Sequence, residues 1–174
     1  MHGQTLPAYT LTGGMRMLKE NWKTIVIWVL VAEGVGALAG LLSREGIQLY
    51  NTAVLQPPLS PPMWLFPVVW GILYALMGIG AGLVSLQPAS SARTRGLNLM
   101  VIQLIVNFFW PLFFFNIQAF GFSLIWLIVL WLLVLWMTLT FRKTSKLAAL
   151  LQIPYLIWLT FALYLNAAVW YLNP

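Results

Sequence analysis

Residues 63–86, MWLFPVVWGILYALMGIGAGLVSL, form a run of 24 residues without a charged side chain. An α-helix rises about 1.5 Å per residue, so a helix of this length can cross the roughly 30 Å hydrocarbon core of a bilayer. Four prolines precede the run within residues 57–62, PPLSPP, where they mark the entrance of a helix rather than its interior. The stretch therefore predicts a membrane-spanning helix that follows a proline-rich loop.

The rest of the chain has the same apolar character. Of its 174 residues, 61% are hydrophobic and 7% are charged, whereas a soluble domain carries roughly 25% charged residues. We therefore predict an all-α integral membrane protein that folds as a bundle of five transmembrane helices. The predicted spans are residues 24–42, 63–86, 97–115, 119–141 and 147–172. Residues 1–23 are assigned to an N-terminal extension, residues 24–174 to a single transmembrane domain, and residues 43–62 to a proline-rich loop.

Basic side chains lie mainly on one side of these spans. Eight of the nine Lys and Arg residues fall on the side of the N-terminus, and Arg44 alone falls on the other side. The eight are Arg16, Lys19, Lys23, Arg93, Arg95, Arg142, Lys143 and Lys146. Because basic loops stay in the cytoplasm, we expect a cytoplasmic N-terminus in a multi-pass protein of the cell membrane. The first apolar run, about 19 residues long, exceeds the 7–15 residues of a signal-peptide core, so we expect no cleavage.

Several classes of chemistry are excluded by composition. The chain has no cysteine, which removes disulfides, thiolate catalysis and cysteine-based metal sites. His2 is the only histidine, and one ligand makes no metal site. There is no P-loop and no dinucleotide-binding fingerprint. The net charge of +6 comes from short loops, a placement that fits membrane orientation better than nucleic-acid binding. We expect no catalytic residue, no metal, no obligatory cofactor and no nucleic-acid partner.

Aromatic and hydrogen-bonding residues share one face on three of the predicted spans, at about 100° per residue. The faces are Phe66, Trp70 and Tyr74; Gln103, Asn107, Trp110 and Phe114; and Tyr155, Trp158, Ala162 and Asn166. Two interpretations are open. The stripes are either ordinary helix packing, with Asn and Gln joining helices, or the walls of a pocket for a flat, hydrophobic ligand.

The tryptophans of the fourth span follow a different pattern. Trp126, Trp131 and Trp136 recur every five residues, so on a helix they point in three directions. We expect them to face lipid or the membrane interface and assign them no role in a site.

One ionisable residue and two glycine pairs lie inside the predicted spans. Glu33 has either a structural or a ligand-facing role, and we leave it out of the predicted site. The small-residue pairs Gly36 with Gly40 and Gly78 with Gly82 seat helices either within one chain or between two chains.

Three segments of the chain resemble motifs of the TspO/MBR family, the tryptophan-rich sensory proteins and translocator proteins. They are PPLSPPMWLFPVVWGILYALMGIGAG at 57–82, QLIVNFFWPLFF at 103–114 and IPYLIWLTFALYLN at 153–166. The resemblance runs from about residue 50 to residue 173 and more loosely through the first span. It implies a five-helix bundle that is often dimeric, with a pocket that opens near the first loop.

The resemblance also implies a ligand class. Members of the family bind tetrapyrroles such as protoporphyrin IX, and animal members bind cholesterol and synthetic benzodiazepine-type ligands. The contacts carried onto this chain are Tyr50, Trp70, Tyr74, Asn107, Trp110, Trp158, Ala162 and Leu165. Tyr50 and Leu165 rest on the resemblance alone. Together with Phe66, Gln103 and Tyr155 from the helical faces, these residues make up the predicted ligand-binding site.

These observations favour a membrane receptor or sensor that binds a porphyrin-like, sterol-like or other flat hydrophobic ligand. One alternative is light-dependent tetrapyrrole breakdown, in which tryptophans beside an excited ring replace acid–base residues. Another is transport of a hydrophobic or anionic metabolite, although the chain shows no inverted repeat and no series of ionisable residues. A scaffold for other membrane proteins is a further alternative. Binding without catalysis is favoured over an enzyme.

Overall fold

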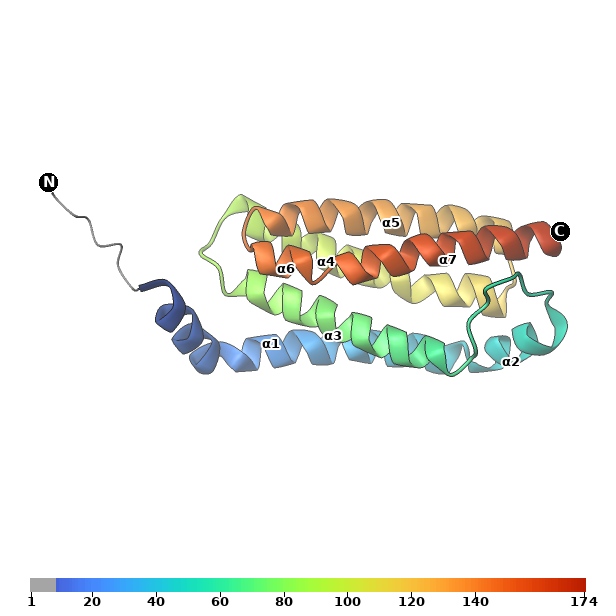
Figure 1. The fold of residues 1–174 in the computed structure, drawn as a ribbon, viewed down its shortest axis with the longest axis horizontal. Coiled ribbons are helices and arrows are strands. Elements are labelled where there is room, and N and C mark those ends of the chain that lie inside the picture. The colour runs from blue at the N-terminus through green and yellow to red at the C-terminus, as the bar shows by residue number, and fades with distance from the viewer. Residues whose placement is uncertain (1–8) are drawn as a thin grey trace, which may run out of the picture.

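The computed structural model describes residues 9–174, which are helical throughout their regular structure and contain no strand (Figure 1). The predicted all-α class is therefore confirmed. The helices are α1 (Tyr9–Leu42), α2 (Arg44–Ala53), α3 (Leu65–Ser85), α4 (Ser91–Pro111), α5 (Phe120–Arg142), α6 (Lys146–Leu150) and α7 (Ile153–Leu172), with a π-helical turn η1 (Leu112–Asn116). Residues 1–8 of the predicted N-terminal extension, including His2, lie outside the described residues.

Five segments of the described chain are long and apolar enough to cross a membrane, which confirms the predicted five-span bundle. They are Asn21–Leu42, Leu65–Ser85, Ser91–Asn116, Phe120–Arg142 and Lys146–Leu172. The predicted boundaries agree with these to within two or three residues, except that the third span begins six residues before the predicted residue 97. Which end of the bundle faces the cytoplasm stays a prediction from the basic loops.

Three parts of the chain differ locally from the predicted pattern. Residues 9–23 continue helix α1 beyond the first span, and a kink at Asn21 (φ −120°, ψ 15°) separates the two parts. The predicted loop 43–62 contains the helix α2, which is too short and too polar to cross a membrane. The last span is broken after α6, and α7 restarts with Pro154 in its first turn, where a missing N–H costs little.

Serine side chains start two of the helices. The Ser90 Oγ accepts a hydrogen bond from the Arg93 backbone N–H at 3.2 Å, and the Ser145 Oγ accepts one from the Ala148 N–H at 3.3 Å. Each serine is the N-cap of the helix that follows it, α4 or α6. The capping serine explains why α4 begins in the polar turn before residue 97.

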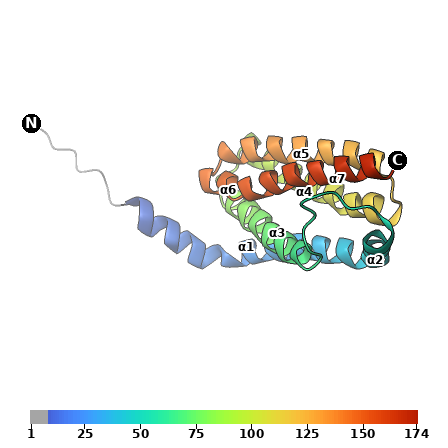
Figure 2. The same cartoon turned by 45° about the vertical axis from the view of Figure 1, so that its right-hand side comes forward.

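The long helices run side by side along one axis, and α1 projects beyond the others toward the N-terminus (Figures 1 and 2). Helix α1 packs on α3, while α5 packs on both α4 and α7. The helix α2 and the loop after it cross the end of the bundle that holds the C-terminus. This arrangement places the aromatic faces of α3, α4 and α7 near one another beneath the first loop.

Glycines on α3 let α1 approach closely. A Cβ atom at Gly78 would overlap main-chain atoms of Trp28 and Val29, and one at Gly82 would lie 2.7 Å from the Ile25 Cα. Of the two alternatives for this glycine pair, the structure therefore shows contact within one chain. At Gly40 an added Cβ would meet no described atom within 4 Å outside the neighbouring part of α1.

Two tryptophans of α5 join helices instead of facing lipid, so our prediction for them was wrong. The Trp126 indole N–H donates to the Val106 carbonyl oxygen on α4 at 2.7 Å, and the Trp131 N–H donates to the Thr160 Oγ1 on α7 at 3.0 Å. Trp136 is 53% exposed in the structure, as expected for a side chain at the lipid. An indole N–H inside a bilayer needs a hydrogen-bond partner in the protein. This need decides where the two rings lie, whereas the five-residue spacing alone predicted that they face lipid.

Replacing Gly78 with alanine should destabilise the bundle, although alanine is the better helix former. The new methyl group would overlap the α1 backbone, and we expect the free energy of unfolding in detergent to fall by about 1–3 kcal/mol. Gly34→Ala is the matched control, because a Cβ built at Gly34 would meet no described atom within 4 Å outside the neighbouring part of α1. Equal effects of the two substitutions would contradict the glycine-mediated contact.

Candidate functional site

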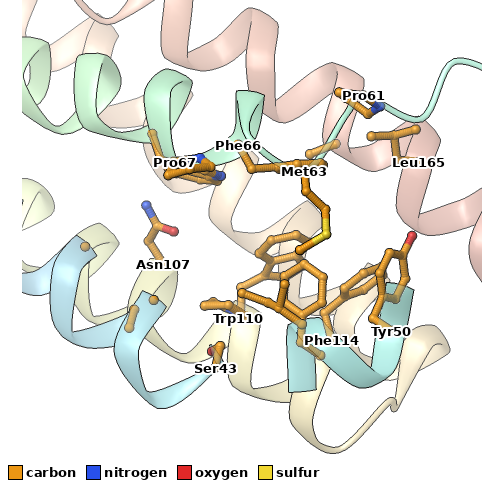
Figure 3. A pocket seen from close by; sticks show the side chains of 18 of the residues that line it. Ser43, Tyr50, Pro61, Met63, Phe66, Pro67, Asn107, Trp110, Phe114 and Leu165 are labelled. Carbon is orange, nitrogen blue, oxygen red and sulfur yellow. The ribbon is translucent and has the colours of Figure 1, made fainter. Parts of the chain in front are cut away.

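A cavity of about 510 Å³ lies inside the bundle, enclosed by α1, α2, α3, α4, η1, α7 and the loop after α2 (Figure 3). Its volume falls within the roughly 300–1,000 Å³ typical of small-molecule sites. Most of the side chains around it are aromatic or aliphatic, with a few polar groups among them. The cavity is therefore the natural candidate for a binding site.

One wall of the cavity consists of aromatic rings from α3 and α7. The Phe66 and Trp158 rings meet edge to face with centroids 6.0 Å apart. The Trp70 and Tyr74 rings lie 5.6 Å apart, one turn further along α3. Ala162, one turn beyond Trp158 on α7, also lines the cavity and keeps space open beside the indole ring. This wall offers planar apolar surface to a ligand.

The facing wall comes from α4, η1 and α2. Trp110 and Phe114 are stacked, with ring centroids 5.2 Å apart and an interplanar angle of 20°, and the Tyr50 ring lies 5.4 Å from Phe114. Figure 3 shows these three rings gathered on one side of the cavity. Pro111 has no N–H to donate to the Asn107 carbonyl, which interrupts the α-helical ladder just before the π-helical turn. Phe114 in that turn thereby reaches the cavity beside Trp110.

A chain of buried hydrogen bonds lies behind the cavity and connects α4 with α7. The Asn107 Nδ2 donates to the Tyr155 hydroxyl at 2.9 Å, and that hydroxyl donates to the Gln103 Oε1 at 3.1 Å. The Gln103 Nε2 lies 3.4 Å from the Met77 sulfur and 3.3 Å from the Met100 sulfur.

The direction of this chain follows from its last members. A thioether sulfur can only accept, so the Gln103 amide must turn its NH₂ group toward the sulfurs and its oxygen toward Tyr155. The Tyr155 hydroxyl then donates to Gln103 and accepts from Asn107. The side-chain oxygen of Asn107, Oδ1, is left without a hydrogen bond among the described residues. Asn107 lines the cavity, and Figure 3 shows this oxygen on the side of Trp110. The cavity thus presents a fixed hydrogen-bond acceptor.

A second polar contact supports the aromatic wall of α4. The Trp110 indole N–H donates to the Asn166 Oδ1 on α7 at 3.3 Å, and the Asn166 Nδ2 donates to the Phe120 carbonyl oxygen at 2.9 Å. These bonds hold the Trp110 ring in position, because Asn166 and Phe120 are themselves buried.

Nine of the eleven predicted site residues line the cavity. They are Tyr50, Phe66, Trp70, Tyr74, Asn107, Trp110, Trp158, Ala162 and Leu165. Gln103 and Tyr155 are fully buried behind the wall, where they orient Asn107. For these two residues the helix-packing interpretation describes the geometry better than the ligand interpretation.

The sequence did not identify the α1 side of the cavity. Glu33, Gly36, Gly40 and Ser43 all line it, at the three- and four-residue spacing of one helical face. That spacing was visible in the sequence, but small residues carry no sign of which neighbour they face. From the first loop, Met63 also contributes (Figure 3).

Hydrogen bonds to α7 hold the first loop over the cavity. The Asn173 side chain, just after α7, donates from its Nδ2 to the Leu55 carbonyl oxygen and accepts from the Leu55 N–H, both at 3.0 Å. The Tyr164 hydroxyl donates to the Pro58 carbonyl oxygen at 3.1 Å. The loop is thus tied at two points along one helix.

Tyr50 occupies the part of the cavity outside the membrane spans. Burial raises the pKa of the Tyr50 hydroxyl to about 12. The phenol therefore stays neutral at physiological pH and can offer a ligand a hydrogen bond without adding charge.

Comparison with known proteins gives a consistent match across the bundle. The model of the TspO/MBR family matches residues 28–172. A tryptophan-rich protein TspO from Chlorobaculum tepidum is 34% identical over 87% of this chain and 96% of its own length. The human translocator protein is 34% identical over 80% of this chain and 85% of its own length. Protein CrtK from Rhodobacter capsulatus is 39% identical over 68% of this chain and 75% of its own length.

Replacing Tyr155 with phenylalanine should remove both hydrogen bonds of its hydroxyl. We expect a loss of about 1–3 kcal/mol in the free energy of unfolding, because two buried amides lose their partner. Tyr171→Phe is the control, since Tyr171 is 85% exposed. Denaturant unfolding of the detergent-solubilised protein measures both. Equal stability of the two variants would show that the buried hydrogen bonds of Tyr155 do not join α4 to α7.

Proposed function

Because this chain belongs to the TspO/MBR family, we propose that it is a membrane receptor or sensor for a flat hydrophobic ligand such as a porphyrin-like tetrapyrrole. The observation that carries the proposal is the cavity between the Trp70–Trp158 wall and the Trp110–Phe114 wall. Protoporphyrin IX is the proposed test ligand, and the proposed site comprises the cavity-lining residues together with Gln103 and Tyr155 behind them.

Binding in this proposal rests on ring contacts and one oriented polar group. A planar ligand lying between the two walls would exchange water and lipid for aromatic faces on both sides. The Asn107 oxygen would accept a hydrogen bond from an N–H or O–H of the ligand and set its orientation in the plane. Gln103 and Tyr155 act through Asn107, because they prevent its amide from turning.

The name of one further relative supports a sensory role. A tryptophan-rich sensory protein from Cereibacter sphaeroides is 34% identical over 90% of this chain. The five spans make this chain a multi-pass integral membrane protein. We propose the cell membrane as its location, with a cytoplasmic N-terminus and a homodimer as its assembly.

The proposal predicts that the cavity tryptophans bind the ligand. Titration of the purified protein with protoporphyrin IX should quench Trp fluorescence saturably, and Trp70→Ala and Trp158→Ala should each weaken the affinity about tenfold or more. A loss of this size corresponds to about 1.4 kcal/mol, which is within the range expected of one aromatic contact.

Trp136→Ala is the matched control, because Trp136 lies on α5 and outside the cavity. It should bind with wild-type affinity. Affinities of the Trp70 and Trp158 variants equal to that of the control would exclude the cavity as the site.

A further inference from the structure

Five basic side chains lie at the end of the bundle opposite the C-terminus, where α4 begins and α5 turns into α6 (Figures 1 and 2). They are Arg93 and Arg95 near the start of α4, and Arg142, Lys143 and Lys146 at the turn between α5 and α6. No acidic residue follows Glu45, so residues 46–174 offer these cations no carboxylate side chain. The opposite charge therefore has to come from outside this part of the chain.

The start of α4 packs directly against the end of α5. A Cβ built at Gly96 would lie 3.0 Å from the Phe141 ring, which is fully buried. The Phe141 carbonyl oxygen accepts hydrogen bonds from the backbone N–H groups of Thr144 at 2.9 Å and Ser145 at 2.7 Å. Because Phe141 both packs on α4 and closes the turn 142–146, the basic turn is held in a fixed position beside α4.

Arg93 lies on the face of α4 that meets this turn. It precedes Gly96 by three residues, and residues three apart lie on one face of a helix. Its side chain is half-buried, and its Nε is shielded from solvent without a hydrogen-bond partner among the described residues. A buried N–H without an acceptor costs free energy. A phosphate oxygen would be a suitable acceptor, because phosphate and guanidinium match in charge and geometry.

The position of the basic group along the helices indicates which anion meets it. The third span begins at Ser91 and the fourth ends at Arg142. The cations therefore lie at the edge of the hydrocarbon core, at the level of the lipid headgroups. The neighbouring parts of α5 and α6 carry exposed apolar side chains, namely Leu139, Leu147 and Leu150. Positive charge next to an apolar surface complements a phospholipid, in which a phosphate adjoins acyl chains.

We propose that Arg93 and the basic turn 142–146 form a binding site for the headgroup of an anionic phospholipid. The N–H groups of Arg93 donate to the phosphate oxygens, and the cations of the turn add electrostatic attraction. A zwitterionic lipid fits less well, because its own cation meets five positive charges and no carboxylate. None of the five cations lines the aromatic cavity, so this inference does not depend on the proposed function.

The test measures lipid binding to the full chain by native mass spectrometry in a neutral detergent. At about 0.15 M salt, charges in water are screened beyond about 8 Å. The probes are phosphatidylglycerol and phosphatidylcholine with identical acyl chains. The variants are Arg93→Met and the double variant Lys143→Gln with Lys146→Gln. Arg95→Met is the matched control, because Arg95 is exposed and lies about 200° around α4 from Arg93.

Wild type and Arg95→Met should bind the first phosphatidylglycerol about tenfold more tightly than phosphatidylcholine. Arg93→Met should lose about tenfold in phosphatidylglycerol affinity, or about 1.4 kcal/mol, and bind phosphatidylcholine like wild type. The lysine double variant should also bind phosphatidylglycerol more weakly. Equal affinity of wild type for the two lipids overturns the proposal, as does unchanged binding by the double variant. Equal losses in Arg93→Met and Arg95→Met overturn it too, because binding would then follow total charge.

The unfolding temperature of the protein without lipid separates binding from a structural role. Since the Arg93 Nε has no partner to lose, Arg93→Met should unfold within about 2 °C of wild type, a shift of well under 1 kcal/mol. Phosphatidylglycerol should then stabilise wild type more than this variant. A large loss of stability in Arg93→Met without lipid overturns the proposal, because the arginine would be structural.

Glycerol 3-phosphate is the probe for a soluble anion, because it carries the phosphate without acyl chains. It should stabilise wild type less than phosphatidylglycerol does at the same concentration. Equal stabilisation by the two compounds would show a site for free phosphate and overturn the assignment to a lipid.

Discussion

The hydrogen-bond chain from Asn107 through Tyr155 to Gln103 is the interaction on which the rest of the bundle depends. Inside a bilayer no water can satisfy an amide or a hydroxyl, so each must find its partner in the protein. Here the three groups satisfy one another across α4 and α7, and the chain ends at two methionine sulfurs. This fixes the two helices that carry Trp110 and Trp158 on either side of the cavity.

The same constraint explains why a cavity exists at all. Helices in lipid approach closely only where small residues allow it, and that contact occurs between α1 and α3 through Gly78 and Gly82. Around the cavity the side chains are large rings, which hold α3, α4 and α7 apart and leave space between them. The first loop closes this space from one end, because Asn173 and Tyr164 hold it against α7.

The fold and most of the cavity could be predicted from the sequence because their signals are periodic. Length and hydropathy predict the five spans, and the four-residue spacing of Phe66, Trp70 and Tyr74 places their rings on one face. Residues on the same helical face lie at different depths from the cavity, which periodicity does not encode. Asn107 lines the cavity, whereas Gln103 is buried behind its wall. Trp126 was missed because its hydrogen bond to Val106 depends on which helix lies next to it. The α1 side required the fold, since segments of small residues carry little pattern of their own. Tyr50 on α2 was predicted by the family resemblance and not by periodicity.

The most direct measurement of the central claim is an experimental structure of the protein with protoporphyrin IX bound. We predict that the macrocycle lies between Trp158 and Trp110, with one of its polar atoms within hydrogen-bond distance of the Asn107 oxygen. A macrocycle bound on the lipid-facing surface of the bundle, with the cavity left unoccupied, would contradict the proposed site.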